Sequence, residues 1–107
     1  MIRPGDVVTV DFPGAQGVKR RPAVVVSTEV YHTVRPDVVV AVLTSQLAGA
    51  LASTDYLLQD WSTAGLRVPT AFRSYFATLP AAAVRVIGRL SDRDMEQVTE
   101  RLRVALV

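Results

Sequence analysis

The chain has 107 residues, of which 50% are hydrophobic, so it is long enough for one modest core and too apolar to be intrinsically disordered. It contains no cysteine, which excludes a disulfide framework and thiol chemistry. No apolar stretch reaches the length of a membrane span, and the first residues follow a strand pattern rather than that of a secretory signal. We therefore expect a single domain over residues 1–107 in a cytoplasmic protein.

Arginine supplies nearly all of the positive charge. The formal net charge is only +2, but Lys19 is the single lysine among the 12 Lys and Arg residues. The guanidinium group binds phosphate bidentately and stacks on nucleobases, which favours a nucleic-acid partner. A composition rich in Arg, Ala and Val is equally typical of a GC-rich genome, so the charge permits nucleic-acid binding without requiring it.

The first predicted strand covers residues 7–12, where apolar and polar positions alternate. Further along, Lys19, Arg20 and Arg21 precede Pro22, and a second, apolar strand begins directly after this proline. Proline favours an extended conformation in the residue before it. We therefore expect Arg21 at the mouth of the second strand and Lys19 and Arg20 on the loop that approaches it.

A further apolar strand carries hydroxyl groups at its other end. After one helical turn predicted at residues 28–33, residues 38–43 form an uninterrupted apolar run suited to the middle of a sheet, and the polar segment Thr44–Gln46 follows. If this strand pairs antiparallel with the strand after Pro22, then Arg21 and the segment Thr44–Gln46 meet at one edge. Guanidinium groups and hydroxyls placed together are suited to binding a phosphate.

The second half of the chain predicts three more strands, at residues 54–58, 70–79 and 84–90. Between the first two of them, Asp60 is expected to cap a helical turn that ends at Gly65. These elements bring the number of predicted strands to six.

The C-terminal segment has the clearest helical pattern. Ser91 followed by Asp94 resembles a capping box at the start of a helix. One apolar stripe follows at helical spacing: Met95, Val98, Leu102 and Ala105. Six short strands and a terminal helix predict a mainly β fold, a small and strongly bent barrel or sandwich of mostly antiparallel strands.

Metal sites and serine–histidine chemistry have little support in the sequence. His32 is the only histidine, and the Asp and Glu residues show no clustered spacing, so neither a metal nor another cofactor is expected. We expect His32 to lie in a loop, with a role as general base as the alternative.

Five segments together resemble the bacterial MazF/PemK family of ribonuclease toxins. In chain order they are Arg3–Asp11, Lys19–Ser27, Val38–Gln46, Asp55-Tyr56 with Asp60–Leu66, and Ile87–Ser91 followed by a helix. They cover nearly the whole chain. The resemblance implies an SH3-like barrel, a homodimer and inhibition by a small antitoxin protein. It also implies metal-independent, sequence-selective cleavage of single-stranded RNA to 2′,3′-cyclic phosphate and 5′-hydroxyl ends.

The resemblance further implies roles for individual side chains. Arg21 would stabilise the phosphorane-like transition state, a task for which one well-aimed donor contributes about 3–4 kcal/mol. Thr44 would orient the scissile phosphate or the attacking hydroxyl, and Arg73 is the third catalytic candidate. The RNA-binding candidates are Lys19, Arg20, Ser45, Gln46 and Tyr75. The same residues have structural explanations as well, such as solvated surface cations and hydroxyls bonded to local backbone.

Tyr75 departs from the family pattern. On an extended strand Arg73 and Tyr75 point to the same face, and Kid-like members of the family carry an Asp at the position of Tyr75. The departure removes a carboxylate that could share in proton transfer, so the sequence does not assign the acid and the base. Tyr75 could stack on a nucleobase instead, or pack on the sheet face as an ordinary aromatic residue.

Two other functions stay open at this point. A CcdB-like toxin shares the fold and poisons DNA gyrase by binding, without chemistry. An inactive relative would serve as an RNA- or protein-binding module, and Tyr75 in place of the acid is consistent with it. Arg21 beside Thr44 argues against the gyrase poison, because a pure binder needs neither residue.

Overall fold

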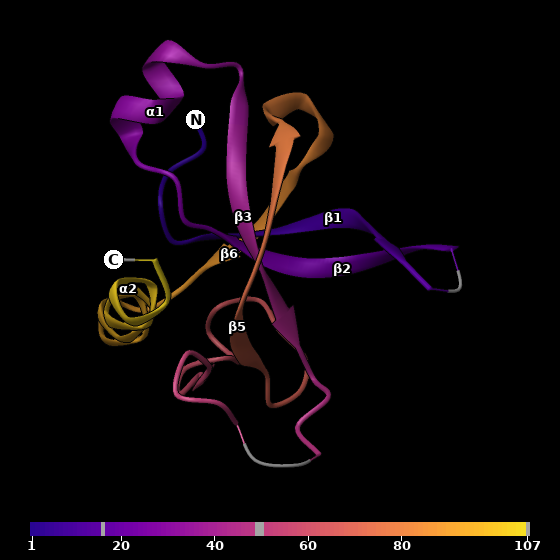
Figure 1. The fold of residues 1–107 in the computed structure, drawn as a ribbon, viewed down its shortest axis with the longest axis vertical. Helices are drawn as coiled ribbons and strands as arrows, with labels where there is room; N and C mark the ends of the chain where they lie inside the picture. The colour runs from indigo at the N-terminus through magenta and orange to yellow at the C-terminus, as the bar shows by residue number, and fades with distance from the viewer. Residues whose placement is uncertain (16, 49–50, 107) are drawn as a thin grey trace.

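The protein folds around one six-stranded antiparallel sheet, seen in a computed structural model that describes residues 1–15, 17–48 and 51–106. The strand order is β4-β5-β3-β2-β1-β6. In chain order the elements are β1 (Asp6–Gly14), β2 (Gly17–Val25), α1 (Glu29–Val34), β3 (Asp37–Thr44), β4 (Tyr56–Leu57), β5 (Ala71–Pro80), a 3-10 turn (Ala81–Ala83), β6 (Arg85–Arg89) and α2 (Asp92–Leu106). Figure 1 shows β1 and β2 running across the direction of β3 and β5, so the sheet curls strongly.

Both faces of this curled sheet are buried around its central strands. Val7 and Val24 belong to a core on one face, together with Val98 of α2. Val8 and Val25, their chain neighbours, belong to a second core on the opposite face. Successive side chains of a strand point to opposite faces, so a strand buried on both sides must be apolar at every position. This explains the uninterrupted apolar runs of β2 and β3, and it confirms the prediction that β3 lies inside the sheet.

The paired strands β1 and β2 form a hairpin that projects beyond β3. β2 pairs with β1 from Gly17 to Val24, whereas its pairing with β3 covers only Ala23 to Val25. The prediction that Lys19 and Arg20 lie on a loop, with Arg21 at the strand mouth, is therefore wrong, because all three lie within β2 (Figure 1).

Pro22 predicts a strand that begins only after it, whereas β2 already begins at Gly17. Pro22 pairs with Thr9 of β1, while the ladder with β3 begins only at Ala23. Proline lacks a backbone N–H and is tolerated where a strand has no ladder on one side. The strand therefore runs through Pro22, and its cations stand on the projecting part of the hairpin.

The structure confirms the other strands and helices with changes at their ends. The helical turn predicted at residues 28–33 is α1, and Thr28 caps it by accepting a hydrogen bond from the Tyr31 backbone N–H at 3.3 Å. The strand predicted at residues 54–58 is reduced to the two residues of β4. Ala105 is exposed, so the apolar stripe of α2 ends before it. No helix among the residues described is long and apolar enough to cross a membrane.

The segment after Asp60 forms a single turn at residues 61–65, in which the Ala64 N–H donates to the Asp60 carbonyl oxygen at 3.2 Å, a bond of helical type, but no regular helix follows. It ends at Gly65, whose φ of +89° belongs to the left-handed region that favours glycine. A Cβ atom at Gly65 would lie 2.6 Å from the carbonyl oxygen of Ile87, so the turn also sits directly against β6. The Asp60 carboxylate accepts hydrogen bonds from Ser91 and Arg93, which is why it does not cap this segment.

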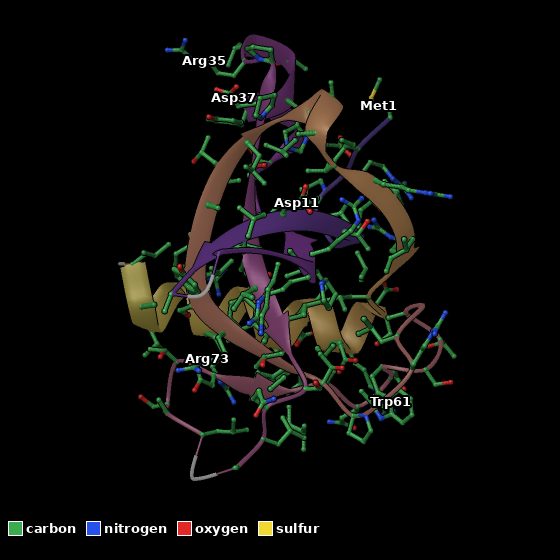
Figure 2. The ribbon with its side chains drawn as sticks, turned by 90° about the vertical axis from the view of Figure 1, so that its right-hand side faces the viewer. Met1, Asp11, Arg35, Asp37, Trp61 and Arg73 are labelled. Carbon is green, nitrogen blue, oxygen red and sulfur yellow. The ribbon has the colours of Figure 1, made fainter. Side chains whose placement is uncertain are left out.

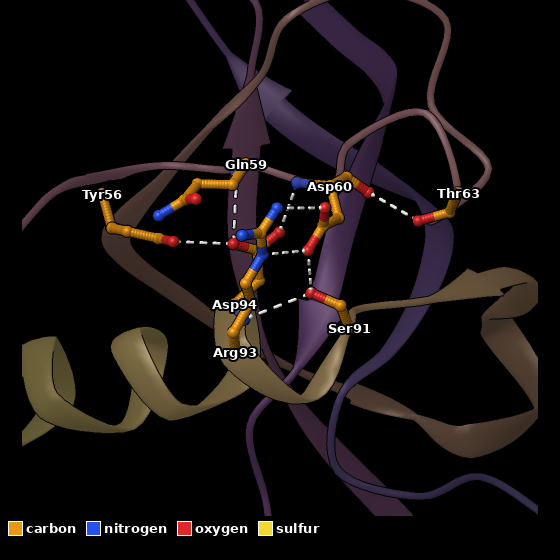
Figure 3. Close-up of polar contacts among 7 residues, drawn as sticks. All are labelled: Tyr56, Gln59, Asp60, Thr63, Ser91, Arg93 and Asp94. Atoms are coloured by element: carbon orange, nitrogen blue, oxygen red, sulfur yellow. Dashed lines mark hydrogen bonds and ion pairs between the residues drawn. The ribbon is translucent and has the colours of Figure 1, made fainter.

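The carboxylate of Asp94 holds this loop to the C-terminal helix (Figure 3). Asp94 is fully buried and accepts hydrogen bonds from the Tyr56 hydroxyl at 2.6 Å, the Gln59 N–H at 3.0 Å and the Asp60 N–H at 2.8 Å. Burial and the bond to Asp94 raise the pKa of Tyr56 to about 12. Ser91 does accept the predicted capping bond from the Asp94 N–H, at 3.3 Å, but the Asp94 side chain serves the loop instead of completing a capping box.

Asp94→Asn should destabilise the protein by about 2–3 kcal/mol. The amide nitrogen of Asn cannot accept the hydrogen bond from Asp60, so a partly buried N–H loses its partner. Asp92→Asn is the matched control, because Asp92 is exposed in the same helical turn and its dipole interaction is worth about 1 kcal/mol or less. Urea unfolding of both variants measures the difference, and equal losses would contradict the assigned role of Asp94.

Asp60 should contribute to the acid limb of the stability curve. Hydrogen bonds from Arg93 at 2.7 Å and from the Ser91 hydroxyl at 2.6 Å lower the pKa of Asp60 from 3.8 to about 2. A lowered pKa in the folded state gives stability that is complete above the unfolded pKa and is lost as the pH falls through the folded one.

The free energy of unfolding of Asp60→Asn should therefore fall furthest below that of the parent at neutral pH. The gap should shrink as the pH drops from about 4 to about 2, the interval set by the two pKa values of Asp60. Denaturant unfolding across this range measures it. A gap of the same size at both ends would show that the ion pair is not responsible.

Candidate functional site

A groove of about 630 Å³ lies between the β1–β2 hairpin, the end of β3 and β5. Its lining residues are Phe12, Ala15, Gly17, Lys19, Arg21, Val42, Thr44, Gln46, Arg73 and Tyr75. The structure thus brings together six of the eight residues selected from the sequence: Lys19, Arg21, Thr44, Gln46, Arg73 and Tyr75.

Strand register places Arg21 next to Thr44. In the antiparallel pair of β2 and β3, Ala23 opposite Val42 is the last pair at this end of the ladder, and Arg21 and Thr44 each lie two residues beyond it. Thr44 is in turn opposite Ala71 of β5, two residues before Arg73. Residues two apart on a strand share a face, so both arginines and the hydroxyl reach the same groove.

The Thr44 side chain is buried and has a defined orientation. Its Oγ1 accepts a hydrogen bond from the Gln46 N–H at 3.1 Å, the local backbone bond typical of Thr at a strand end. Accepting this bond fixes the oxygen and leaves the hydroxyl proton as a donor. Thr44 can therefore hold an anionic oxygen in the groove without first breaking a contact.

Arg73 and Tyr75 supply the β5 wall. The Arg73 side chain is 56% exposed, and its Nε lies 3.8 Å from Oδ1 of Asp55. Tyr75 is 55% exposed, and its ring packs against the ring of Phe12 with centroids 5.9 Å apart. One part of the Tyr75 ring is supported by the sheet while the rest is open to a stacking partner.

The groove is suited to an anion. Its charged lining residues are Lys19, Arg21 and Arg73, and no carboxylate lines it among the residues that the structure describes. Arginine provides two parallel N–H donors to a phosphate, and an adjacent hydroxyl adds a third. Opposed strands thus present two guanidinium groups and one oriented hydroxyl to a single concave space.

Arg20 and Ser45, the other two selected residues, lie in a neighbouring groove of about 660 Å³. Arg20 alternates with Lys19 and Arg21 on β2 and is tied to Asp11 at 3.2 Å and to the Thr9 hydroxyl at 3.0 Å. The second groove shares Lys19, Arg21, Thr44 and Gln46 with the first, so the two spaces meet at the Arg21–Thr44 pair.

His32 is remote from these grooves. It lies in α1 rather than in the expected loop, and its Nε2 is 2.6 Å from the Ser27 hydroxyl. Its buried Nδ1 has no hydrogen-bond partner among the residues described, so no carboxylate completes a catalytic triad. Figure 2 places Arg35 and Asp37, at the α1 end, far above Arg73, so the alternative role of His32 as general base at the groove finds no support.

Sequence reasoning missed the parts played by Asp55 and Asp94. In the sequence, Asp55 stands out only as part of a family segment, and its spacing does not indicate the approach to Arg73 of β5. Asp94 fitted a helix-capping pattern, and its burial depends on the tertiary contact with Tyr56. No cluster of three or more potential metal-ligating His, Cys, Asp or Glu side chains occurs in the described part of the chain.

Residues 3–106 match the family model described as the PemK-like, MazF-like toxin of type II toxin–antitoxin systems. The comparison with curated proteins gives no match. Among solved structures, an endoribonuclease in complex with its cognate antitoxin from a mycobacterial species has 19% identity and a TM-score of 0.79, covering 99% of this chain and 95% of that one.

Two further solved structures have the same fold. The Mycobacterium tuberculosis toxin MazF-mt6 has 22% identity and a TM-score of 0.75, with 94% of each chain covered. A chain of the MazE–MazF complex (Form III) from Deinococcus radiodurans has 19% identity and a TM-score of 0.75, covering 98% of this chain and 95% of that one. These likenesses confirm the predicted SH3-like fold, a small curled β barrel with a C-terminal helix.

Proposed function

Because the chain belongs to the PemK-like, MazF-like toxins of type II toxin–antitoxin systems, we propose that it is a metal-independent endoribonuclease that cleaves single-stranded RNA at selected sequences. The observation that supports this most directly is the convergence of Arg21, Thr44 and Arg73 on one groove. The family supplies the reaction class, and the groove supplies groups of the right chemistry for it.

The proposed reaction uses the nucleophile of the RNA itself. The 2′-hydroxyl loses its proton and attacks the adjacent phosphorus, the bond to the 5′-oxygen of the next nucleotide breaks, and that oxygen takes up a proton. The products carry a 2′,3′-cyclic phosphate and a 5′-hydroxyl. Arg21 and Arg73 donate to the phosphate oxygens as negative charge develops, and Thr44 orients the scissile phosphate.

The remaining groove residues bind the flanking nucleotides in this proposal. Lys19 binds a backbone phosphate, Gln46 reads a base edge, and the exposed part of Tyr75 stacks on a base. Arg20 and Ser45 in the second groove bind the RNA where it continues past the reaction centre.

We also propose that the chain, a single toxin domain, acts in the cytoplasm as a homodimer that a cognate antitoxin neutralises. The edge strand β6 exposes Val86 and Ile87, apolar side chains that a second copy would cover. Similar solved structures include a complex with a cognate antitoxin and MazE–MazF complexes.

A second candidate is an inactive relative that binds RNA without cleaving it. Tyr75 stands where Kid-like relatives carry an Asp, and within the described part of the chain no carboxylate lines the groove. This candidate predicts RNA binding with no products.

We expect the purified protein to cleave mixed single-stranded RNA with a chelator in excess, leaving 5′-hydroxyl and 2′,3′-cyclic phosphate ends. The sequence offers one His and no Cys, a poor ligand set for a catalytic metal. End-group analysis of the fragments checks the products. Activity lost to EDTA and restored by a divalent ion would contradict metal independence, and binding without cleavage would favour the inactive relative.

Arg21→Ala and Lys19→Ala should affect different steps. Loss of Arg21 should slow cleavage of bound RNA roughly a hundred- to thousandfold, the equivalent of about 3–4 kcal/mol of transition-state stabilisation. Loss of Lys19 should weaken binding and lower its salt slope by roughly one unit, with bound RNA cleaved at the parent rate. Single-turnover rates at saturating enzyme separate the two, and a normal rate for Arg21→Ala would refute its catalytic role.

Sedimentation at micromolar concentration should show a dimer. Ile87→Lys places a charge on the exposed face of β6 and should shift the protein toward monomer if this strand lies at the interface. Val34→Lys is the matched control, because Val34 is exposed on α1 rather than on β6. A monomeric parent protein would refute the proposed assembly.

A further inference from the structure

We propose that Asp55 is a positioning residue for Arg73 and thereby sets the geometry of the groove, an inference that rests on the proposed RNA cleavage. Asp55 does not line the groove. Its Oδ1 lies 3.8 Å from Nε of Arg73, the guanidinium nitrogen that is joined to the aliphatic part of the side chain. The two terminal nitrogens remain for a phosphate, which takes two parallel N–H donors.

Asp55 is held independently of Arg73. Its side chain is only 8% exposed, and its Oδ2 accepts a hydrogen bond from the Ala52 N–H at 3.0 Å. Its own N–H donates to the Ala52 carbonyl at 2.9 Å, which closes a tight turn. The carboxylate therefore keeps its place when Arg73 moves.

The C-terminal helix anchors the backbone at the same point. Arg101 of α2 donates from Nε to the Asp55 carbonyl oxygen at 2.9 Å, and its guanidinium carbon lies 5.5 Å from the centre of the Tyr56 ring. Tyr56 in turn donates to the buried Asp94. A rigid connection thus runs from the core to Asp55, whereas Arg73 is more than half exposed and depends on a neighbour for its orientation.

The contact is better suited to orientation than to stability. At 3.8 Å it is an ion pair beyond hydrogen-bond distance, and pairs with one exposed partner contribute little to folding. A carboxylate near an RNA groove also repels the substrate phosphates. Removal of its charge should therefore leave RNA binding unchanged or tighter while slowing the chemistry, a combination that loss of a binding residue does not produce.

The test compares Asp55→Asn with Asp37→Asn. Asn at position 55 can still accept the hydrogen bond from the Ala52 N–H. Asp37→Asn removes one negative charge as well, but at the start of β3, far from Arg73 (Figure 2). Asp55→Asn should lower the single-turnover rate roughly tenfold or more, because small errors in orientation are costly in catalysis. Its affinity for an uncleavable 2′-deoxy oligonucleotide should not fall, and Asp37→Asn should match the parent in both.

A double-mutant cycle shows whether Asp55 acts through Arg73. In an Arg73→Ala background, Asp55→Asn should change the rate by less than about twofold, because the residue it orients is gone. Asp55→Glu, which restores the charge, should recover part of the lost rate. An equal loss with and without Arg73, or no loss at all, would overturn the inference.

A measurement without catalysis separates this inference from the proposed function. The ¹⁵N–¹H signal of Arg73 Nε should report restricted motion in the parent and in Asp37→Asn, and greater mobility in Asp55→Asn. This result in a protein that cleaves no RNA would refute the proposed function and leave the positioning contact standing. If the protein cleaves RNA but the mobility of Arg73 Nε is the same in Asp55→Asn as in the parent, the inference is refuted and the proposed function stands.

Discussion

The antiparallel pairing of β2 with β3 determines where Arg21 and Thr44 lie. Both faces of this pair are buried, with Val24 and Ala41 in one core and Ala23 and Val42 in the other. A slip of one residue would exchange the faces of a whole strand and disturb both cores, so burial specifies the register strongly. Arg21 and Thr44 each lie two residues beyond the last pair of this ladder and line the same groove, so the position of the polar pair is a consequence of apolar packing.

β3 extends this arrangement to a third strand. It pairs with β2 on one side and with β5 on the other, so the groups of β2 and β5 converge at its end. To the side of β3, β1 and β2 continue as a hairpin (Figure 1) that forms one wall of the groove. Arg73 is exposed and Arg21 is half-buried, yet both belong to strands whose pairing is set by the core.

A second support comes from the helix. Buried carboxylates are tolerated when their hydrogen-bonding capacity is filled, and Asp94 receives three donors from the segment around β4 (Figure 3). Together with Arg101 it fixes the loop that carries Asp55. The geometry of the groove therefore depends on contacts between α2 and the segment around β4, and none of the proposed catalytic residues takes part in these contacts.

The sequence predicts which strands and helices form better than it predicts where each of them begins and ends. Alternation and apolar runs located the strands and α2, because burial acts on each of these segments directly. Charge and proline around Arg21 indicated a loop, since local pattern does not reveal that β1 covers one side of this strand while the other side has no ladder. The meeting of Arg21 with Thr44 followed from an assumed pairing that the structure confirms. The approach of Asp55 to Arg73 and the burial of Asp94 depend on residues distant in sequence, which no local pattern encodes.

The most direct test of this account is a crystal structure with an RNA oligonucleotide whose scissile 2′-hydroxyl is replaced by hydrogen, so that it binds without reacting. We expect one phosphate within hydrogen-bond distance of the Arg21 and Arg73 guanidinium groups and of the Thr44 hydroxyl, with the strand continuing into the second groove. RNA bound to another surface, or a phosphate held by only one of the three, would contradict the assignment of this groove as the reaction centre.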